Sequence, residues 1–409
     1  MEYIAALDLG TSKMLAMAAS KDDRQKILAT KQIESGDSMR RGFIYKTTEA
    51  SAKIAELIQC LNQELQEAHL PVLKQVYVGI GGKGLHTKAY SVEKNIHGNI
   101  VDDEILDQLR DECQADWNGT FELIEKTSPE YFIDGHPESQ PQGVRCKKIE
   151  ARFQLVLGHF SEFKTEVEKA LRKESVEIAD IFVSPIATAK QVLTEKEKRY
   201  GCALIEFGAG VTYLSVYHSG LLRYLVTIPL GGNAITQDIR SLDRVEEEAE
   251  ELKINEGSAW FDDKTNELNN LIEARADEII ANILRQIDIS GYGQALNAGF
   301  ILTGGTSRLE GLDSLLRRRT DKPIRRVEEF PEQSCVRGLL QSGNENCAKE
   351  TGLSSPTPTR RKLWDDILGY TDEIQQPKIK KTKTGIIKGI KEKAEEVTKK
   401  GAGILFDFD

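Results

Sequence analysis

Three short turns, rich in glycine and hydroxyl side chains, carry the residues of this sequence that are best suited to chemistry. Each turn follows an apolar run typical of a buried strand, and their sequences are Asp8-Leu9-Gly10-Thr11-Ser12-Lys13, Glu206-Phe207-Gly208-Ala209-Gly210-Val211-Thr212 and Leu302-Thr303-Gly304-Gly305-Thr306. Because glycine reaches left-handed backbone conformations, such turns bring backbone N–H groups close to an anion and form a nest for phosphate oxygens. One such turn is a weak signal, whereas three together indicate a phosphate-binding site.

Side chains within the turns would complete such a site. Thr11, Ser12 and Thr212 would add hydroxyl donors. Asp8, at the end of its strand, would hold Mg²⁺ through water, because Mg²⁺ keeps several of its waters and binds few carboxylates. The alternative interpretation is that the turns are plain hairpins and that Asp8 caps one of them.

The first two turns predict the elements that must position these residues. Both have the order apolar, apolar, acid, apolar, glycine, and both join apolar runs, at residues 3–17 and 202–217. A pattern that recurs after about 200 residues predicts two related halves that face each other. The length of 409 residues supports this division, because a single core usually stops growing at about 250–300 residues.

The rest of the chain divides into segments that differ in periodicity and composition. Residues 49–68 have helical periodicity, residues 83–165 are typical of a small inserted α+β unit, and residues 244–290 are mainly helical. Between 341 and 384 the periodicity fades and Ser, Thr, Pro and charged residues increase, which predicts a linker.

Composition excludes several classes of protein. The chain is 39% hydrophobic and 29% charged, which is ordinary for a globular protein. Its net charge of −10 argues against a chain-wide nucleic-acid surface. Residues 377–409 contain nine lysines and five acidic residues, a net charge of +4, so residues 1–376 carry −14. A basic tail on an acidic body suggests that the tail has its own partner.

The cysteines and histidines suggest no disulfide framework and no metal site of their own. The six cysteines are widely spaced without a CxxC motif, and the six histidines form no pair at i, i+4. No signal peptide and no apolar run of about 20 residues is visible, so we expect reduced thiols, a cytoplasmic location and at most peripheral membrane contact.

Together the three turns resemble the two phosphate motifs and the adenosine motif of the actin/Hsp70/sugar-kinase superfamily. Within it, residues 1–340 resemble the FtsA family of actin-like bacterial cell-division proteins. Further matching segments are Ser38-Met39-Arg40-Arg41-Gly42, Pro129-Glu130-Tyr131-Phe132-Ile133-Asp134, Ala249-Glu250-Glu251-Leu252-Lys253 and Leu309-Glu310-Gly311-Leu312.

The resemblance implies an α/β, actin-like, two-lobed ATPase fold made of duplicated RNase H-like domains. It implies subdomain 1A at 1–82 and 166–205, an inserted α+β subdomain 1C at 83–165, subdomain 2A at 206–243 and 298–340 with a return to 1A, subdomain 2B at 244–297, a flexible linker at 341–384 and a membrane-targeting amphipathic helix at 385–409.

The resemblance also implies that ATP and Mg²⁺ lie between the two halves. The implied metal residues are Asp8 and Glu206. The implied nucleotide residues are Gly10, Thr11, Ser12, Lys13, Gly208, Ala209, Gly210, Val211, Glu250, Lys253, Gly304, Gly305 and Thr306. Glu250 and Lys253 are spaced i, i+3 and therefore share one helix face, which in relatives contacts ribose and base. The alternative is a surface ion pair.

The second turn departs from the family pattern. Glu206, Ala209 and Val211 stand where relatives carry Asp, Gly and Thr, and Tyr213 stands where an acid is common. Near residues 184–191 the family places an acid or amide that orients the attacking water. Ser184-Pro185 offers no acid at the start of that helix, and Gln191 stands further along it. Since phosphoryl transfer depends on positioning, we expect nucleotide binding with slow or negligible hydrolysis.

The end of the chain has an amphipathic pattern. On a helical wheel the apolar residues lie within an arc of about 100° and most charged residues lie outside it. The apolar residues expected to bind a membrane are Ile386, Ile387, Ile390, Val397, Ile404, Leu405 and Phe408. Lysines within and before this segment suit an anionic bilayer surface. A helix that docks on this protein or on a partner is the alternative.

These features lead to a functional hypothesis. The resemblance implies an ATP-dependent adaptor on the cytoplasmic face of the bacterial inner membrane, at the division site. It would self-associate into dimers or filaments, bind the FtsZ C-terminal peptide on subdomain 2B and contact downstream division proteins, but not nucleic acid. The alternatives are an actin-like scaffold of pilus assembly and, less well supported, a small-molecule kinase.

Overall fold

The computed structural model describes residues 1–115, 121–261 and 265–349. Residues Met1–Ser354 form one compact unit. The expected membrane-targeting helix at 385–409 lies outside the described residues, as does nearly all of the expected linker.

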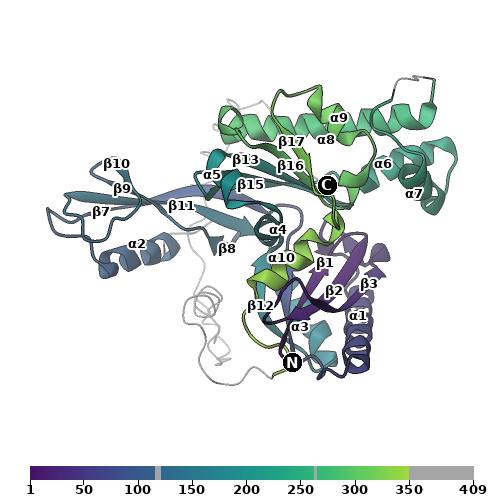
Figure 1. Ribbon diagram of the computed structural model, residues 1–409, viewed down its shortest axis with the longest axis horizontal. Helices are drawn as coiled ribbons and strands as arrows, with labels where there is room; N and C mark the ends of the chain where they lie inside the picture. The colour runs from purple at the N-terminus through teal and green to yellow at the C-terminus, as the bar shows by residue number, and fades with distance from the viewer. Residues whose placement is uncertain (116–120, 262–264, 350–409) are drawn as a thin grey trace, which may run out of the picture. The chain divides into compact units, whose positions relative to one another are not determined.

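In the part of the chain that the structure describes, five strands form the first sheet (Figure 1), in the order β12 (Glu177–Val183), β6 (Gln75–Ile80), β1 (Tyr3–Leu9), β2 (Lys13–Ser20) and β3 (Ile27–Glu34). The predicted hairpin is confirmed, because β1 pairs antiparallel with β2 from Tyr3↔Ser20 to Leu9↔Met14. Helices α1 (Thr47–Glu67) and α3 (Ser161–Lys173) pack on this half. The predicted apolar stripe of α1 is fully buried, at Ile54, Leu57, Ile58, Leu61 and Leu65.

A second sheet contains ten strands of the described residues. Its first part comes from the region expected to be inserted: β10 (His136–Glu138), β9 (Glu130–Ile133), β11 (Lys148–Gly158), with β8 (Glu122–Lys126) beside it, and β7 (His86–Asn95). The sheet continues through β15 (Leu221–Ile228), β14 (Thr212–His218), β13 (Cys202–Phe207), β16 (Gly299–Thr303) and β17 (Ile324–Arg326). Strand β7 joins β15 through a single register pair, Val226↔His86.

The two halves repeat one arrangement, as the sequence predicts. In the first half β1 lies between an antiparallel partner, β2, and a parallel partner, β6. In the second half β13 lies between antiparallel β14 and parallel β16. Each turn of interest therefore begins at the end of a buried central strand.

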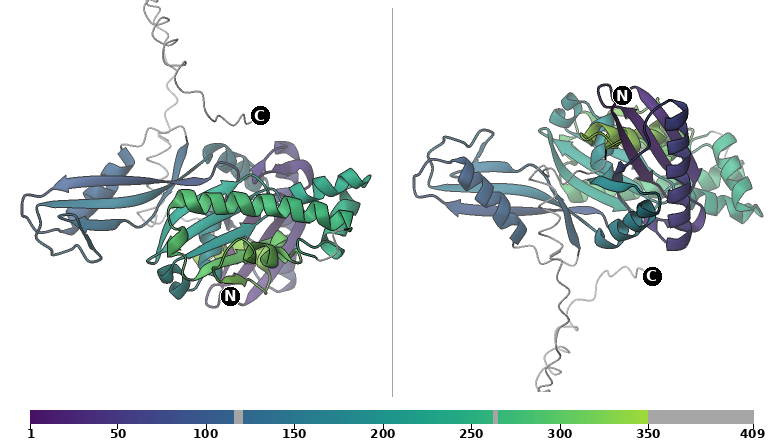
Figure 2. Two further views of the ribbon diagram at one scale, coloured as in Figure 1. Left: turned by 90° about the horizontal axis from the view of Figure 1, so that it is seen from above. Right: turned by 90° about the horizontal axis from the view of Figure 1, so that it is seen from below.

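Helices cover the second half. Helix α8 (Glu267–Ser290) runs along strands β14 and β15 (Figure 2), and α6 (Gly232–Ile239) packs between it and α7 (Glu246–Asn255). The predicted helical character of 244–290 is confirmed, and the apolar face of α8 is buried with α9 (Leu312–Arg317) in one core. Helix α2 (Asp103–Ala115) covers the inserted strands.

The first residues of the expected linker, 341–349, pack on the first half of the protein. Helix α10 (Ser334–Ser342) packs against α4 (Ser184–Val192), which is followed by α5 (Glu195–Tyr200). Beyond α10 the chain returns to β1, where the Cys347 N–H donates to the Tyr3 carbonyl at 2.9 Å, and Cys347 is fully buried. The boundary at 341 is therefore too early, because residues 343–349 complete the packing of the first sheet.

Two expectations about chemistry concern the described residues. The described cysteines Cys60, Cys146, Cys202, Cys335 and Cys347 are free. Within the described ranges no helix combines the length and apolar character that crossing a bilayer requires.

Candidate functional site

One cavity of about 560 Å³ brings the three turns together, a volume typical of small-molecule sites. All the residues predicted to bind nucleotide or metal line it: Asp8, Gly10, Thr11, Ser12, Lys13, Glu206, Gly208, Ala209, Gly210, Val211, Glu250, Lys253, Gly304, Gly305 and Thr306. Thr212, expected as a donor, is instead buried, and its hydroxyl donates to the Leu230 carbonyl at 2.8 Å.

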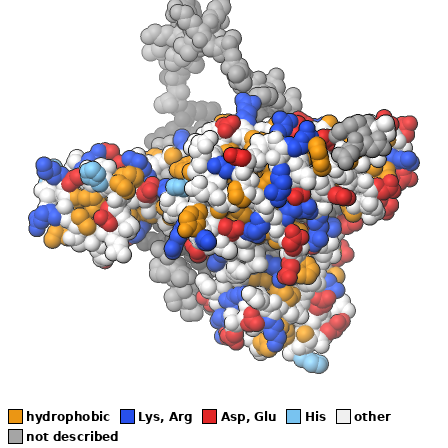
Figure 3. Space-filling view, turned by 45° about the horizontal axis from the view of Figure 1, so that its top comes forward, with side chains coloured by type: hydrophobic (Ala, Val, Ile, Leu, Met, Phe, Trp, Pro, Cys, Tyr) orange, Lys and Arg blue, Asp and Glu red, His pale blue; other side chains and the backbone are white. Residues whose placement is uncertain are grey.

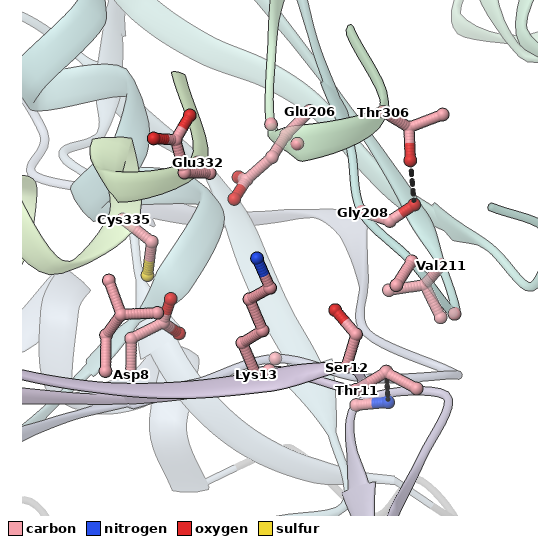
Figure 4. A pocket seen from close by; sticks show the side chains of 18 of the residues that line it. Asp8, Thr11, Ser12, Lys13, Glu206, Gly208, Val211, Thr306, Glu332 and Cys335 are labelled. Carbon is pink, nitrogen blue, oxygen red and sulfur yellow. Dashed lines mark hydrogen bonds between the residues drawn. The ribbon is translucent and has the colours of Figure 1, made fainter. Parts of the chain in front are cut away.

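The first turn is a tight hairpin between β1 and β2. A Cβ at Gly10 would lie 2.6 Å from the Lys13 carbonyl oxygen, so the turn requires glycine there. The Thr11 hydroxyl accepts the Gly42 N–H at 2.9 Å, and Ser35 donates to the Gly10 carbonyl at 2.8 Å. The Lys13 side chain points into the cavity (Figure 4), where its ammonium group faces the space that an anion would fill.

The second turn is held from behind by two other segments. Its Gly208 N–H donates to the Val211 carbonyl at 3.0 Å. The Gly208 carbonyl accepts the Gly232 N–H at 3.0 Å and the Thr306 hydroxyl at 3.0 Å (Figure 4). These bonds fix the second turn to the third turn and to the start of α6.

The third turn depends on a left-handed glycine. Gly304 has φ +87°, and a Cβ there would lie 2.8 Å from the Phe207 carbonyl carbon. Its N–H donates to the Pro331 carbonyl at 3.1 Å. Gly305 is different, because the nearest heavy atom to its Cβ position is Glu332 Cβ at 3.9 Å. Gly304 therefore shapes the turn, whereas Gly305 offers open backbone to the cavity.

Two partly buried carboxyl groups, those of Asp8 and Glu206, face the cavity from opposite halves. Burial raises the pKa of Asp8 to about 6. Burial, and then the nearby charge of Asp8, raises the pKa of Glu206 to about 8. Among the described residues, three side-chain oxygens are buried without a hydrogen-bond partner: Glu206 Oε2, Thr188 Oγ1 and Ser215 Oγ.

This donor set fits a divalent cation. A buried carboxylate oxygen without a partner is costly, and a cation bound through water would satisfy Glu206 and Asp8 together. Within the described ranges no group of three or more His, Cys, Asp or Glu residues could hold a metal ion. Two carboxyl groups are a donor set suited to a cation that keeps most of its waters.

Helix α7 contributes the pair Glu250 and Lys253. Lys253 Nζ bonds the Thr236 hydroxyl at 2.8 Å, the Gly232 carbonyl at 3.3 Å and Glu250 at 2.5 Å. Burial lowers the pKa of Lys253. The Lys253 side chain is 9% exposed and that of Glu250 is 43% exposed. The pair is therefore no solvated surface pair: Lys253 anchors α7 to α6, and Glu250 is the more accessible member.

Sequence reasoning missed several lining residues, including Gly42, Gly79, Gly81, Ser184, Ile254, Arg308, Glu332 and Cys335. Cys335 lies beside Asp8 (Figure 4), and its thiol is fully buried. The glycine-rich run Gly79-Ile80-Gly81-Gly82 at the end of β6 is a sequence signal for some of them, because glycines permit close approach of a backbone. Gln191, considered as a water-orienting residue, bonds Gln341 instead and does not line the cavity.

Two facing halves, each built on a hairpin whose turn lines one shared cavity, define an actin-like fold. A chain of the PilM-PilN type IV pilus biogenesis complex is similar to it, with a TM-score of 0.58, 18% identity, and coverage of 84% of this chain and 98% of that one. The ethanolamine utilization protein EutJ from Carboxydothermus hydrogenoformans has a TM-score of 0.52, with 14% identity over 84% of this chain and 90% of that one.

The sequence relationships define the family within this fold. The family model of the cell division protein FtsA matches residues 203–404. The cell division protein FtsA of Porphyromonas gingivalis is 30% identical over 339 residues, which cover 77% of this chain and 70% of that protein. That of Bacillus subtilis is 28% identical over 346 residues, covering 77% and 76%. The chain belongs to the FtsA family of cell-division proteins, as the resemblance indicated.

Proposed function

We propose that this protein binds ATP with Mg²⁺ between its two halves and tethers FtsZ filaments to the cytoplasmic membrane at the division site. One observation carries the nucleotide part. Glycine turns that begin near residues 10, 208 and 304 line the same cavity. Membership of the FtsA family supports the cell-division part.

The nucleotide would be held by groups from both halves. Backbone N–H groups of the first two turns would surround the phosphates, together with the ammonium group of Lys13. Asp8 and Glu206 would hold Mg²⁺ through water, and the cation would neutralise phosphate charge. Glu250 and the third turn would contact the nucleoside, because they line the same cavity beside Lys253.

Hydrolysis would be slow. Helix α4 presents Ser184 to the cavity, and Ser184 has no carboxylate or amide to orient an attacking water. The amide of Gln191 is engaged by Gln341. ATP would therefore act by holding the two halves together in an assembly-competent form, and turnover would stay below the roughly 1 s⁻¹ typical of slow kinases.

Different parts of the chain would contact the membrane and FtsZ. The apolar stripe of residues 386–408 would enter the bilayer interface, with nearby lysines attracted to anionic headgroups. The FtsZ C-terminal peptide would dock on the region 244–297, whose helix α7 begins with Glu246, Glu247 and Glu248. Acidic side chains gather at the right-hand end of the face shown in Figure 3. Self-association would let several weak membrane anchors act together.

Vesicle recruitment tests the tethering part. The full chain, purified FtsZ and anionic vesicles would be sedimented together, with a chain that ends at residue 384 as the matched control. We expect FtsZ to pellet with vesicles only when the full chain is present. Equal pelleting of FtsZ with the shortened chain, or no pelleting with the full chain, would contradict the proposal.

The pilus-scaffold and kinase alternatives gain no separate support. Likeness at 18% identity to the pilus complex chain shows a shared fold alone.

A further inference from the structure

The segment 38–42, which the sequence singles out, has no role in the nucleotide contacts described so far. It contains strand β4 (Met39–Arg40) and the turn at residues 41–42 that leads to its paired strand, β5 (Phe43–Ile44). Arg41 has φ +50° and Gly42 has φ +78°. A left-handed conformation is costly for Arg41, so the surrounding structure must hold this turn in place.

Backbone contacts connect this turn to the first glycine turn and to residues 82–83. The Gly42 N–H donates to the Thr11 hydroxyl at 2.9 Å, and the Lys83 N–H donates to the Arg41 carbonyl at 3.0 Å. A Cβ at Gly42 would lie 2.5 Å from the Gly82 Cα. The two backbones are therefore packed closely together.

Tyr213 reaches the same point from the second half. It lies on β14, just after the second glycine turn, and its buried hydroxyl accepts the Gly82 N–H at 2.5 Å. A Cβ at Gly42 would lie 3.3 Å from this hydroxyl. The phenol thus bridges the halves at the inner side of the cavity, which it also lines.

A second side chain of the same half fixes the same segment. The Thr227 hydroxyl lies 3.0 Å from the Gly82 carbonyl and 3.0 Å from the Leu85 carbonyl. Residues 82–85 lead directly into β7, the first strand of the inserted unit. Beyond this segment, β7 meets β15 through the single register pair Val226↔His86.

These contacts close a ring. It runs from Thr11 through Gly42 and Gly82 to Tyr213, and it returns along β14 to Gly210, whose Cβ position lies 2.6 Å from Thr11 Oγ1. The ring includes residues of the first and second glycine turns. It also includes Gly82, which leads into the first strand of the inserted unit.

We infer that Tyr213 is a positioning residue that couples the nucleotide turns to the first strand of the inserted unit. The inference rests on the proposed nucleotide site. A ligand can shift a conformation only through contacts that differ between the two states. A nucleotide that holds Thr11 and Gly210 together stabilises the closed ring, and Gly82 then fixes the start of β7. Nucleotide binding therefore restrains the inserted unit.

Hydrogen exchange of the full chain, with and without Mg²⁺ and a non-hydrolysable ATP analogue, tests this coupling. In the unaltered protein we expect exchange to slow in the turns at 8–13 and 206–212 and also in residues 82–95, by roughly fivefold or more. Tyr213→Phe removes the hydroxyl that accepts the Gly82 N–H. At saturating analogue it should keep the slowing in the turns and lose it in 82–95, with analogue affinity falling roughly two- to tenfold.

A matched control lies on the same strand. Tyr217 is also buried on β14 but lies beside Cys202 and Glu125 rather than Gly82. Tyr217→Phe should keep the slowing in both regions. If Tyr213→Phe does not fold, Thr227→Val carries the same test, because it removes the hydroxyl that holds Gly82 and Leu85.

The possible outcomes distinguish a failure of the Tyr213 coupling from a failure of the nucleotide site. Retained slowing of 82–95 in folded Tyr213→Phe at saturating analogue would overturn the coupling and leave the nucleotide site standing. If the unaltered protein shows no slowing in the turns at any analogue concentration, the nucleotide site fails, and the coupling fails with it.

Discussion

Gly210 and Thr11, which are remote in sequence, lie in contact at the cavity. A Cβ placed on Gly210 would lie 2.6 Å from the Thr11 hydroxyl oxygen and 2.7 Å from its methyl carbon. A larger residue is excluded at Gly210 because there is no space for its side chain, and not because the backbone conformation requires glycine. The turn of the first hairpin therefore packs on the turn of the second, and a phosphate bound there would be enclosed from both halves.

This contact predicts the effect of Gly210→Ala. The added methyl group would push the two turns apart, because overpacking a tight contact typically costs about 1–3 kcal/mol. We expect affinity for a fluorescent ATP analogue, measured by equilibrium titration, to fall about tenfold or more. Gly293→Ala is the control, since its nearest heavy atom would be 3.4 Å away in ordinary contact. Unchanged affinity in Gly210→Ala would mean that the contact is irrelevant to binding.

The third turn distinguishes a structural glycine from a binding glycine. Gly304→Ala should lower the melting temperature of the nucleotide-free protein, because φ +87° and the Phe207 backbone leave no room for Cβ. Gly305→Trp should leave the melting temperature nearly unchanged and abolish analogue binding, because its side chain would enter the cavity. Thermal unfolding and titration of both variants check this. Normal binding by Gly305→Trp would place the nucleoside elsewhere.

The buried carboxyl groups predict a pH dependence. The pKa of Glu206 is about 8 in the folded protein against an ordinary value of 4.5, so the folded state holds its proton more tightly. The resulting contribution to stability is complete below pH 4.5 and is lost as the pH rises through about 8. In that window the free energy of unfolding should fall by up to about 1.4 kcal/mol per pH unit for one proton.

Glu206→Gln should flatten this dependence. Urea unfolding without nucleotide should show the variant more stable than the unaltered protein at pH 8.5, with a smaller difference at pH 5. Glu332→Gln provides the comparison, because Glu332 lines the same cavity but pairs with Arg308 at 3.0 Å, and it should keep the slope. Parallel stability profiles for Glu206→Gln and the unaltered protein would contradict the assignment.

Much of this arrangement follows from local sequence. The hairpins at residues 3–20 and 202–218 could be predicted because apolar runs flank a glycine turn, and α1 because its apolar residues repeat with helical spacing. The convergence of the turns could be predicted only through the repeat and the family resemblance.

Other parts depend on tertiary contacts that no local pattern encodes. Cys335 joins the site because α10 packs against α4, and residues 343–349 return to β1 through Cys347 despite a linker-like composition. Tyr213 is conspicuous in the sequence only as a departure from the family pattern, and its role arises from the backbone of Gly82, which belongs to the other half.

Removal of the Lys253 charge should lower the stability of the protein. Lys253→Met would remove the largely buried ammonium group that bonds Glu250, the Thr236 hydroxyl and the Gly232 carbonyl, and would leave the direct bond from the Thr236 hydroxyl to Glu250. We expect a loss of about 1–3 kcal/mol in the free energy of unfolding. Glu250→Gln should cost less than about 1 kcal/mol, because its side chain is 43% exposed and the amide still accepts. Equal effects in denaturant unfolding would contradict the anchoring role of Lys253.

The terminal segment predicts a face-specific effect on membrane binding. Ile390→Asp would place a charge within the apolar stripe and should abolish pelleting of the full chain with anionic vesicles. Glu395→Asp, on the polar side of the helical wheel, preserves the charge and should pellet normally. If both variants pellet alike, the segment does not bind the bilayer through this stripe.

The most direct measurement is a structure of the protein with Mg²⁺ and a non-hydrolysable ATP analogue. The account predicts that the phosphates lie between the turns at Gly10 and Gly208, with the nucleoside beside Gly304 and Glu250. Nucleotide density at another place, or an empty cavity in crystals grown at saturating analogue, would contradict it.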